Sequence, residues 1–266
     1  MPLEQLEIGG LRIAYERAGE GPLLVLLHGF VGDSRTWRHQ IEGLSDAFTV
    51  VAWDAPGSGR SDDPPESFRM PDYADALAGF VDALHQGRPH VVGLSFGGAL
   101  ALELYRRHPT IPRTLVLAGA YAGWAGSLPP EIVAQRLQSS LQLADLPPDR
   151  LVSTLLPTMF SASVSAETAA GFAISMAEFH PAGFRAMARS VAEADLRDVL
   201  PIITVPTLLL YGDQDVRASL AVAAEIHAAV PSSRLVVLPG VGHVSSVEAA
   251  ERFDAEVRAF LRSAQD

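Results

Sequence analysis

The sequence predicts an α/β fold in which a mostly parallel, doubly wound β-sheet carries an all-helical insert. Three observations predict it. Continuous apolar runs of strand length recur along the chain, helical patterns alternate with them, and one long stretch near the middle shows helical patterns only. Continuous apolarity is typical of strands buried on both faces, and strands that alternate with helices form parallel sheets with right-handed crossovers.

The chain starts with a predicted β-hairpin, because residues 3–10 and 11–19 alternate in polarity around a Gly-Gly pair. Six continuous apolar runs follow, and each is expected to form one strand of the sheet. These runs occupy residues 22–29, 48–57, 90–95, 113–120, 206–213 and 233–240.

Helical patterns lie between the apolar runs. Residues 70–86 place apolar side chains on one stripe at helical spacing, which predicts an amphipathic helix. Two further helical patterns, at 219–230 and 246–264, follow the last two predicted strands. The stripe on the first of these helices consists of Tyr73, Leu77, Phe80, Val81 and Leu84.

The alternation breaks between residue 121 and about residue 200, where three or four helical patterns follow one another without a strand. The proline pairs at 129–130 and 147–148 fit helix starts, since proline is tolerated in the first turn of a helix. We therefore predict a core formed by residues 1–121 and 201–266, with a helical cap of residues 122–200 inserted between its strands.

Composition excludes several classes of function. The formal net charge of −11 repels phosphate backbones, so nucleic-acid binding is not expected. The chain has no cysteine and no lysine, which excludes thiolate nucleophiles, disulfides, Schiff-base chemistry and P-loops. No metal-binding motif stands out, so neither a metal nor a cofactor is expected.

Targeting signals are also missing from the sequence. No window reaches the roughly 18 apolar residues of a membrane span. The first ten residues lack the apolar core of a signal peptide. We expect a cytoplasmic protein without a membrane span, either a monomer or a homodimer.

Residues 93–97, Gly-Leu-Ser-Phe-Gly, match the G-x-S-x-G pattern of a nucleophile elbow. The motif follows a predicted buried strand and precedes a helical pattern, which is the context it requires. Ser95 is expected on a tight, strained turn, with glycine two residues away on either side because side chains there would collide. A hydroxyl at a helix N-terminus suits a nucleophile, since free N–H groups favour developing negative charge.

His243 is the predicted general base. It lies in a short Gly-rich loop after the last predicted strand, from which it can reach back over the edge of the sheet. His28 is interpreted as a structural loop residue rather than a second base. The other histidines that we weighed lie before the elbow strand, at the end of the elbow helix, in the insert or on a later helix: His85, His90, His108, His180 and His227.

Two acidic residues after the strand at 206–213 could orient the histidine. Asp215 is favoured, because Asp213 follows the strand immediately and is expected to cap or shape the turn. The chain order is then Ser, Asp, His, and such a carboxylate fixes the imidazole tautomer and stabilises the imidazolium.

An oxyanion hole needs two backbone N–H groups. Phe96, directly after the nucleophile, is expected to supply one, and Phe30, in the loop after the first long parallel strand, the other. Gly29 lets the backbone there approach the substrate closely.

With these motifs in place, the sequence resembles the α/β-hydrolase superfamily, in the branch that has a helical cap between strands six and seven. The resemblance spans essentially the whole chain, is specific for the fold and the triad, and is much less specific for substrate. It implies that the loop from Asp54 to Ser61 is structural, and Ser58 lacks the glycine spacing of a second nucleophile. The motifs are HGF (28–30), DAPGSGRSDDP (54–64), GLSFGG (93–98), GDQD (212–215) and GVGH (240–243).

Departures from individual branches narrow the expected chemistry. Ser95 differs from the aspartate of family dehalogenases and epoxide hydrolases. Leu94 stands where carbon–carbon bond hydrolases often carry Asn, and Phe96 stands where prolyl aminopeptidases usually carry Trp. The sequence is most similar to enol-lactonases, acyl-homoserine lactonases and small carboxylesterases. We therefore expect a serine hydrolase of a small ester or lactone; cleavage of a vinylogous diketone and a non-catalytic receptor on this fold remain the alternatives.

Aromatic and methionine residues of the insert are expected to roof an apolar substrate pocket. Ordinary helix packing is the competing interpretation for each one. Arg185 and Arg189 could pair with a substrate carboxylate but are interpreted as solvated surface residues. The predicted pocket residues are Gly29, Trp37, Trp124, Met159, Phe160, Phe172, Met176, Phe179 and Phe184.

Overall fold

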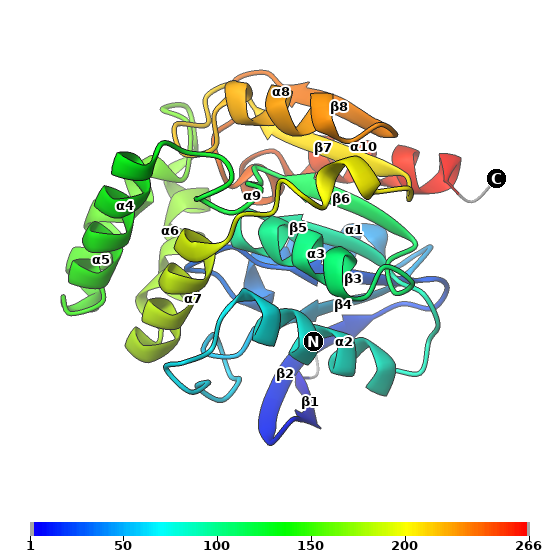
Figure 1. The fold of residues 1–266 in the computed structure, drawn as a ribbon, viewed down its shortest axis with the longest axis horizontal. Coiled ribbons are helices and arrows are strands. Elements are labelled where there is room, and N and C mark those ends of the chain that lie inside the picture. The colour runs from blue at the N-terminus through cyan, green and yellow to red at the C-terminus, as the bar shows by residue number, and fades with distance from the viewer. Residues whose placement is uncertain (1–2, 265–266) are drawn as a thin grey trace.

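The computed structural model describes residues 3–264 and contains one eight-stranded sheet (Figure 1). The strand order is β1-β2-β4-β3-β5-β6-β7-β8. Strands β1 (Leu3–Ile8) and β2 (Leu11–Ala18) form the predicted antiparallel hairpin, and β2 also pairs antiparallel with β4 (Thr49–Trp53).

The other strands are parallel, which confirms the predicted fold class. Each of the six apolar runs contains one strand, and β3 through β7 are buried along their whole length. Both faces of the sheet must therefore be covered by helices. Besides β4, the parallel strands are β3 (Leu23–Leu27), β5 (His90–Leu94), β6 (Thr114–Ala118), β7 (Thr207–Gly212) and β8 (Ser233–Leu238).

Side chains of β3 alternate between two cores. Leu23, Val25 and Leu27 pack into the core that also holds α2, α3 and α8. Leu24 and Leu26 pack into the opposite core, with α1 and α10. Successive residues of a strand point to opposite faces, so a continuous apolar strand serves both cores. These helices are α1 (Arg38–Leu44), α2 (Met70–Ala83), α3 (Phe96–Arg107), α8 (Leu220–Ala229) and α10 (Ala250–Ser263).

Four α-helices lie between β6 and β7 and gather at one end of the sheet (Figure 1). They are α4 (Pro130–Leu143), α5 (Pro148–Leu155), α6 (Ala166–Ala177) and α7 (Pro181–Glu193). We call them the helical cap. Both proline pairs do start helices, and within residues 3–264 no strand interrupts the cap. The domain limits drawn from the sequence stay a prediction, and their ends at residues 1–2 and 265–266 lie outside the described residues.

Two details differ from the sequence-based expectation. The helix expected at 246–264 is divided into α9 (Ser245–Glu248) and α10, because Ala249 leaves the helical region with φ −132° and ψ 48°. The crossover after β3 forms a 3₁₀ turn, η1 (Ser34–Trp37), and then α1, which are too short to give a clear helical period. In the part of the chain that the structure describes, no helix is both long and apolar enough to cross a bilayer.

Candidate active site

Ser95 joins the end of β5 to the start of α3. Its φ of 54° and ψ of −111° lie in a region that residues with a side chain seldom adopt, and its N–H donates to the carbonyl of Ala118 at 2.8 Å. Ser95 is partly exposed, although the residues on both sides of it are buried. The strained turn therefore presents the hydroxyl outward from the sheet, above the N-terminus of α3.

The two glycines of the motif permit a close approach of backbone to backbone. A Cβ atom on Gly93 would lie 2.2 Å from the carbonyl oxygen of Gly97, and one on Gly97 would lie 2.2 Å from that of Leu27. Neither contact can be relieved by a side-chain rotation, since both partners are backbone atoms. Side chains at these two positions would push α3 away from β5 and β3.

His243 and Asp215 form a buried pair. Nδ1 of His243 lies 2.8 Å from Oδ2 of Asp215, and Oδ1 of Asp215 accepts the N–H groups of Arg217 at 2.8 Å and Ala218 at 2.9 Å. The side chain of His243 is 3% exposed and that of Asp215 is fully buried. An ionised carboxylate only accepts hydrogen bonds, so Nδ1 carries the proton and Nε2 is left as the basic nitrogen.

The neighbouring carboxylate, Asp213, has a different role. Its Oδ1 accepts the N–H of Gly240 at 2.7 Å, which ties the end of β7 to the turn after β8. Asp213 is exposed, and it shapes the turn as the sequence indicated. Of the two acidic residues considered, the structure brings Asp215 to the histidine.

Two further polar residues of the motif loops, His28 and Asp54, are engaged in the scaffold. The ring of His28 is buried, with Nδ1 2.7 Å from the carbonyl of Gly29 and Nε2 accepting the N–H of Ala55 at 3.0 Å. Asp54 accepts backbone N–H groups of Ser34 at 2.7 Å and Arg60 at 2.8 Å. Neither side chain has a free polar atom directed at Ser95.

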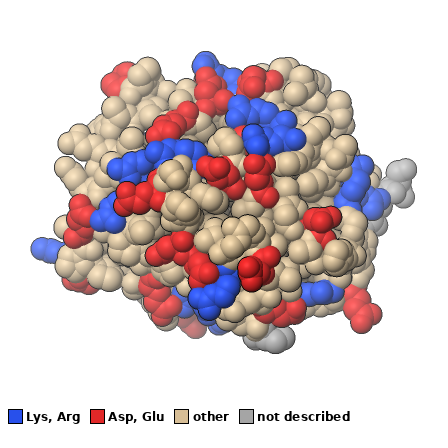
Figure 2. All heavy atoms as spheres, turned by 60° about the horizontal axis from the view of Figure 1, so that its bottom comes forward, with Lys and Arg blue, Asp and Glu red and all other residues tan. Residues whose placement is uncertain are grey.

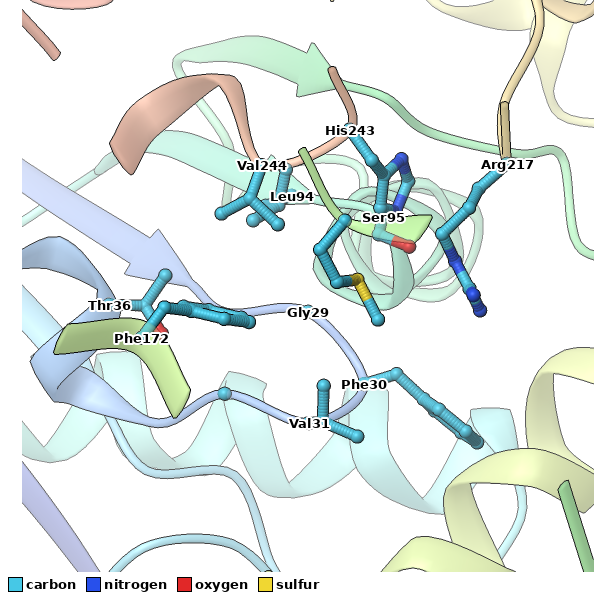
Figure 3. A pocket seen from close by; sticks show the side chains of 12 residues that line it. Gly29, Phe30, Val31, Thr36, Leu94, Ser95, Phe172, Arg217, His243 and Val244 are labelled. Atoms are coloured by element: carbon cyan, nitrogen blue, oxygen red, sulfur yellow. The ribbon is translucent and has the colours of Figure 1, made fainter. Parts of the chain in front are cut away.

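A small pocket brings Ser95 and His243 together (Figure 3). Its volume of about 20 Å³ is room for about one water molecule. The predicted residues Gly29, Met159 and Phe172 contribute to its wall, as does Phe30. The complete lining is Gly29, Phe30, Val31, Gly32, Thr36, Leu94, Ser95, Met159, Phe172, Arg217, His243 and Val244.

Six residues predicted for the pocket lie elsewhere. Trp37 does not line the pocket, contrary to the expectation from the sequence. It is fully buried in the core, with its ring 6.1 Å from that of Phe253. Phe160 packs edge-on against Phe172 at 5.4 Å, behind the pocket wall. A periodic apolar pattern could not separate inner from outer positions in the cap. The others outside this pocket are Trp124, Met176, Phe179 and Phe184, of which Trp124 and Phe184 contact Phe30.

Two backbone N–H groups flank Ser95. Phe96 is the first residue of α3, and Phe30 lies in the loop after β3 that lines the pocket. Within residues 3–264 neither N–H donates to a protein acceptor. The side chain of Phe96 packs in the core against Tyr73, with ring centroids 5.4 Å apart, which fixes the start of α3.

A sequence model of the alpha/beta hydrolase fold matches residues 22–250 of this chain. The chain belongs to the alpha/beta hydrolase family. A thermophilic esterase of Thermogutta terrifontis, solved with malate bound, is 27% identical with a TM-score of 0.92, and the match covers 100% of both chains. The enol-lactonase of Burkholderia xenovorans LB400 is 26% identical with a TM-score of 0.89, over 97% of this chain and 100% of that one.

Relatives known by sequence include a further esterase. The pimeloyl-[acyl-carrier protein] methyl ester esterase of Vibrio campbellii is 25% identical over 254 residues, which are 92% of this chain and 97% of the relative. The 2-(acetamidomethylene)succinate hydrolase of Mesorhizobium japonicum is 25% identical over 90% of this chain and 87% of the relative. The chain is therefore similar to several hydrolases that are named for different substrates.

Sequence reasoning missed two residues beside the Ser95–His243 pocket of this hydrolase. Gly119 follows β6 with φ +50°, and it packs against the His243 ring. Arg217 lines the pocket from the loop after β7. The Gly-Ala pair at the end of the fourth apolar run, 113–120, was a weak signal for Gly119. An arginine in a polar loop gives no signal for Arg217. Among residues 3–264, no group of three or more His, Asp or Glu side chains could hold a metal ion.

Proposed function

We propose that this protein hydrolyses a carboxylic ester or lactone of a small, largely apolar substrate, using Ser95, His243 and Asp215 as a catalytic triad. The observation that carries the proposal is the strained Ser95 in one pocket with His243, whose Nδ1 is hydrogen-bonded to buried Asp215. The names of the esterase and enol-lactonase relatives support the same reaction type.

Acylation begins with attack of Ser95 Oγ on the carbonyl carbon, while Nε2 of His243 takes the hydroxyl proton. A tetrahedral intermediate forms, with its negative charge on the former carbonyl oxygen. It collapses when Nε2 returns the proton to the leaving oxygen. The alcohol departs, or in a lactone the ring opens, and the acyl group remains on Ser95.

Deacylation reverses these roles with water. Nε2 takes a proton from water as its oxygen attacks the acyl carbon, and the second tetrahedral intermediate expels Ser95 Oγ, which regains the proton. The net reaction consumes one water molecule and yields a carboxylic acid and an alcohol. Asp215 keeps Nδ1 protonated throughout and stabilises the imidazolium that forms twice per turnover.

In both intermediates, the backbone N–H groups of Phe30 and Phe96 donate hydrogen bonds to the oxyanion in the proposed mechanism. The start of α3 adds the positive end of the helix dipole at the same place. Such donors act only when negative charge develops, and loss of one typically costs about 10²–10³ in rate.

The first experiment follows acid release in a pH-stat on matched lactones and open-chain esters, including acyl-homoserine lactones, with Ser95→Ala as the control. We expect activity that is lost at least 10³-fold in Ser95→Ala. A lactone preference of 100-fold or more defines a lactonase, and a preference for linear esters defines a carboxylesterase. Equal rates in wild type and Ser95→Ala would contradict the proposal that Ser95 is the nucleophile of a catalytic triad.

A second readout does not depend on choosing the right substrate. Diethyl p-nitrophenyl phosphate transfers its diethylphosphoryl group to an activated serine and releases p-nitrophenol. Mass spectrometry of the intact protein and of its peptides should place the added mass on Ser95. A protein that turns over no ester and is not labelled is a binding protein on this fold, and the proposal is then wrong.

A further inference from the structure

Arg217 places a guanidinium group beside the candidate nucleophile. It lies in the loop after β7, two residues beyond Asp215, and lines the pocket that contains Ser95 and His243. Figure 3 shows its side chain extending along the same side of the pocket as these two residues. The side chain is partly buried, and this burial lowers the pKa of Arg217 by desolvation, although an arginine remains charged.

Hydrogen bonds from several elements hold Arg217 in place. Its N–H donates to Oδ1 of Asp215 at 2.8 Å, and its carbonyl accepts the hydroxyl of Tyr121 and Nη2 of Arg136, the latter at 3.1 Å. Nη1 of Arg217 donates to Oγ1 of Thr158 at 3.0 Å. The backbone and the guanidinium are therefore positioned before any substrate arrives.

In the part of the chain that the structure describes, the guanidinium of Arg217 forms no salt bridge, although Asp215 lies near enough to act on its charge. Within residues 3–264, no carboxylate oxygen lies within 4.0 Å of its guanidinium nitrogens. Asp215 is close in sequence, but its oxygens are engaged by His243 and by two backbone N–H groups. Thr158 accepts one hydrogen bond, so most of the five N–H donors of the guanidinium are left without a protein acceptor.

Several surface arginines, unlike Arg217, pair with a carboxylate. Arg12 pairs with Asp62 at 2.7 Å and Arg107 with Asp75 at 2.7 Å. Figure 2 shows arginine and acidic side chains intermixed over one face of the molecule. A chain with a net charge of −11 has carboxylates to place beside Arg217, and a partly buried charge without a partner is costly.

A second arginine extends the positive charge toward the outside. Arg136, on α4, lines with Arg217 a neighbouring cavity of about 400 Å³ between the cap and the loop after β7. Its guanidinium lies over the rings of Tyr121 at 5.7 Å and Trp124 at 5.9 Å, and Nη1 donates to the Tyr121 hydroxyl at 2.9 Å. Arg217 lines both this cavity and the small pocket beside Ser95. Its guanidinium therefore lies at the junction of the two, next to any anionic group that extends from one into the other.

We propose that Arg217 binds a free carboxylate of the substrate, so that the preferred substrates are half-esters of dicarboxylic acids or lactones that carry a carboxylate. The inference rests on the proposed ester hydrolysis at Ser95. A guanidinium pairs with a planar carboxylate through two parallel hydrogen bonds. Met159 and Phe172 face the apolar part of the substrate.

The test compares two methyl esters with the same five-carbon acyl chain, monomethyl glutarate and methyl pentanoate. Wild type is expected to hydrolyse monomethyl glutarate with a kcat/KM at least tenfold higher. Arg217→Gln should lower kcat/KM for monomethyl glutarate, mainly through KM, at least tenfold more than for methyl pentanoate. The kcat/KM of Arg217→Lys for monomethyl glutarate should lie between those of wild type and Arg217→Gln, because lysine keeps the positive charge but lacks the planar guanidinium group.

A matched control is Arg150→Gln, because Arg150 is exposed on α5 of the cap and lines neither hollow. This variant should keep the wild-type ratio between the two esters. An equal loss on both esters in Arg217→Gln would mean that Arg217 only supports the Asp215 loop, and the proposal is then overturned. A wild-type preference for methyl pentanoate overturns it as well, while ester hydrolysis at Ser95 stands.

Binding separates failure of this proposal from failure of the proposed function. Calorimetry with glutarate on Ser95→Ala, and on the same variant carrying Arg217→Gln, needs no turnover. Binding that Arg217→Gln weakens at least tenfold supports the carboxylate site even if neither ester is hydrolysed. No difference between the two proteins overturns it whatever the activity.

Discussion

A Cβ atom at Gly119 would lie only 3.1 Å from Nδ1 of His243. The same atom would lie 3.2 Å from Oδ2 of Asp215. Gly119 directly follows β6, so the strand next to β5 and β7 sets the place of the hydrogen-bonded pair. The backbone at Gly119, directly after β6, thus packs against the side chains of His243 and Asp215.

Gly119→Ala should lower kcat at least tenfold, because its φ of +50° disfavours a side chain and the new methyl group displaces the His243–Asp215 pair. Gly171→Ala in α6 is the control, since a Cβ there meets nothing within 4 Å and alanine favours a helix. Steady-state kinetics of both variants decide the matter. An unchanged kcat in Gly119→Ala would show that the pair tolerates the shift.

Asp215→Asn should lower kcat by about 10³–10⁴, because an amide can donate to Nδ1 and stabilise the wrong imidazole tautomer. Asp213→Asn is matched in size and chemistry and should stay within about threefold of wild type, since its acceptor oxygen for Gly240 is kept. If the two variants lose activity equally, Asp215 is not the orienting carboxylate.

Met159→Ala should move the preferred acyl chain to greater length. Met159 is 3% exposed and fills one wall of the small pocket, so truncation opens space beside Ser95. The variant should lose about 2–5 kcal/mol of stability, as is usual for a buried methionine. Initial rates on methyl esters of increasing chain length check the shift, and an unchanged optimum with the expected loss of stability would place the acyl chain elsewhere.

His90 should make the protein less stable as pH falls. Burial lowers the pKa of His90 to about 4, below the ordinary value of 6.5, and its Nδ1 lies 2.9 Å from Thr114 Oγ1. Between pH 6.5 and 4 the unfolded chain binds the extra proton, so stability rises with pH and is lost as pH falls through this window. The contribution is at most roughly 3 kcal/mol.

Urea unfolding of wild type and His90→Gln at several pH values between 7 and 4 checks this expectation. The stability of wild type relative to the variant should fall as the pH is lowered, because the variant lacks the titrating ring. Parallel curves for the two proteins would mean that His90 titrates normally. Carboxylates elsewhere affect both proteins alike and cancel in the difference.

The fold and the elbow could be predicted because their signals are local. Continuous apolar runs mark strands buried on both faces, and the structure contains a strand in every one. The G-x-S-x-G spacing at 93–97 reflects contacts within one turn, where Cβ atoms on Gly93 and Gly97 would strike backbone oxygens. Ser95, His243 and Asp215 were named from such loop positions at strand ends.

The lining of the pocket was harder to predict. Met159 and Phe172 face Ser95, whereas Trp37 is buried in the core and Met176 lies outside the pocket. All four are apolar residues in or near helices. Which side of a cap helix faces Ser95 depends on how the cap packs on the sheet, and the apolar period of a single helix does not contain this information.

Arg217 shows most clearly what only the tertiary structure decided. In the sequence it is one arginine in a polar loop, with acidic residues two and four positions before it. The fold turns both carboxylates away, Asp215 to His243 and Asp213 to Gly240, and leaves the guanidinium in the pocket with Ser95. Local patterns determine which backbone elements form, but the partner of a charge is chosen by residues far apart in the chain, because electrostatic pairing acts through space.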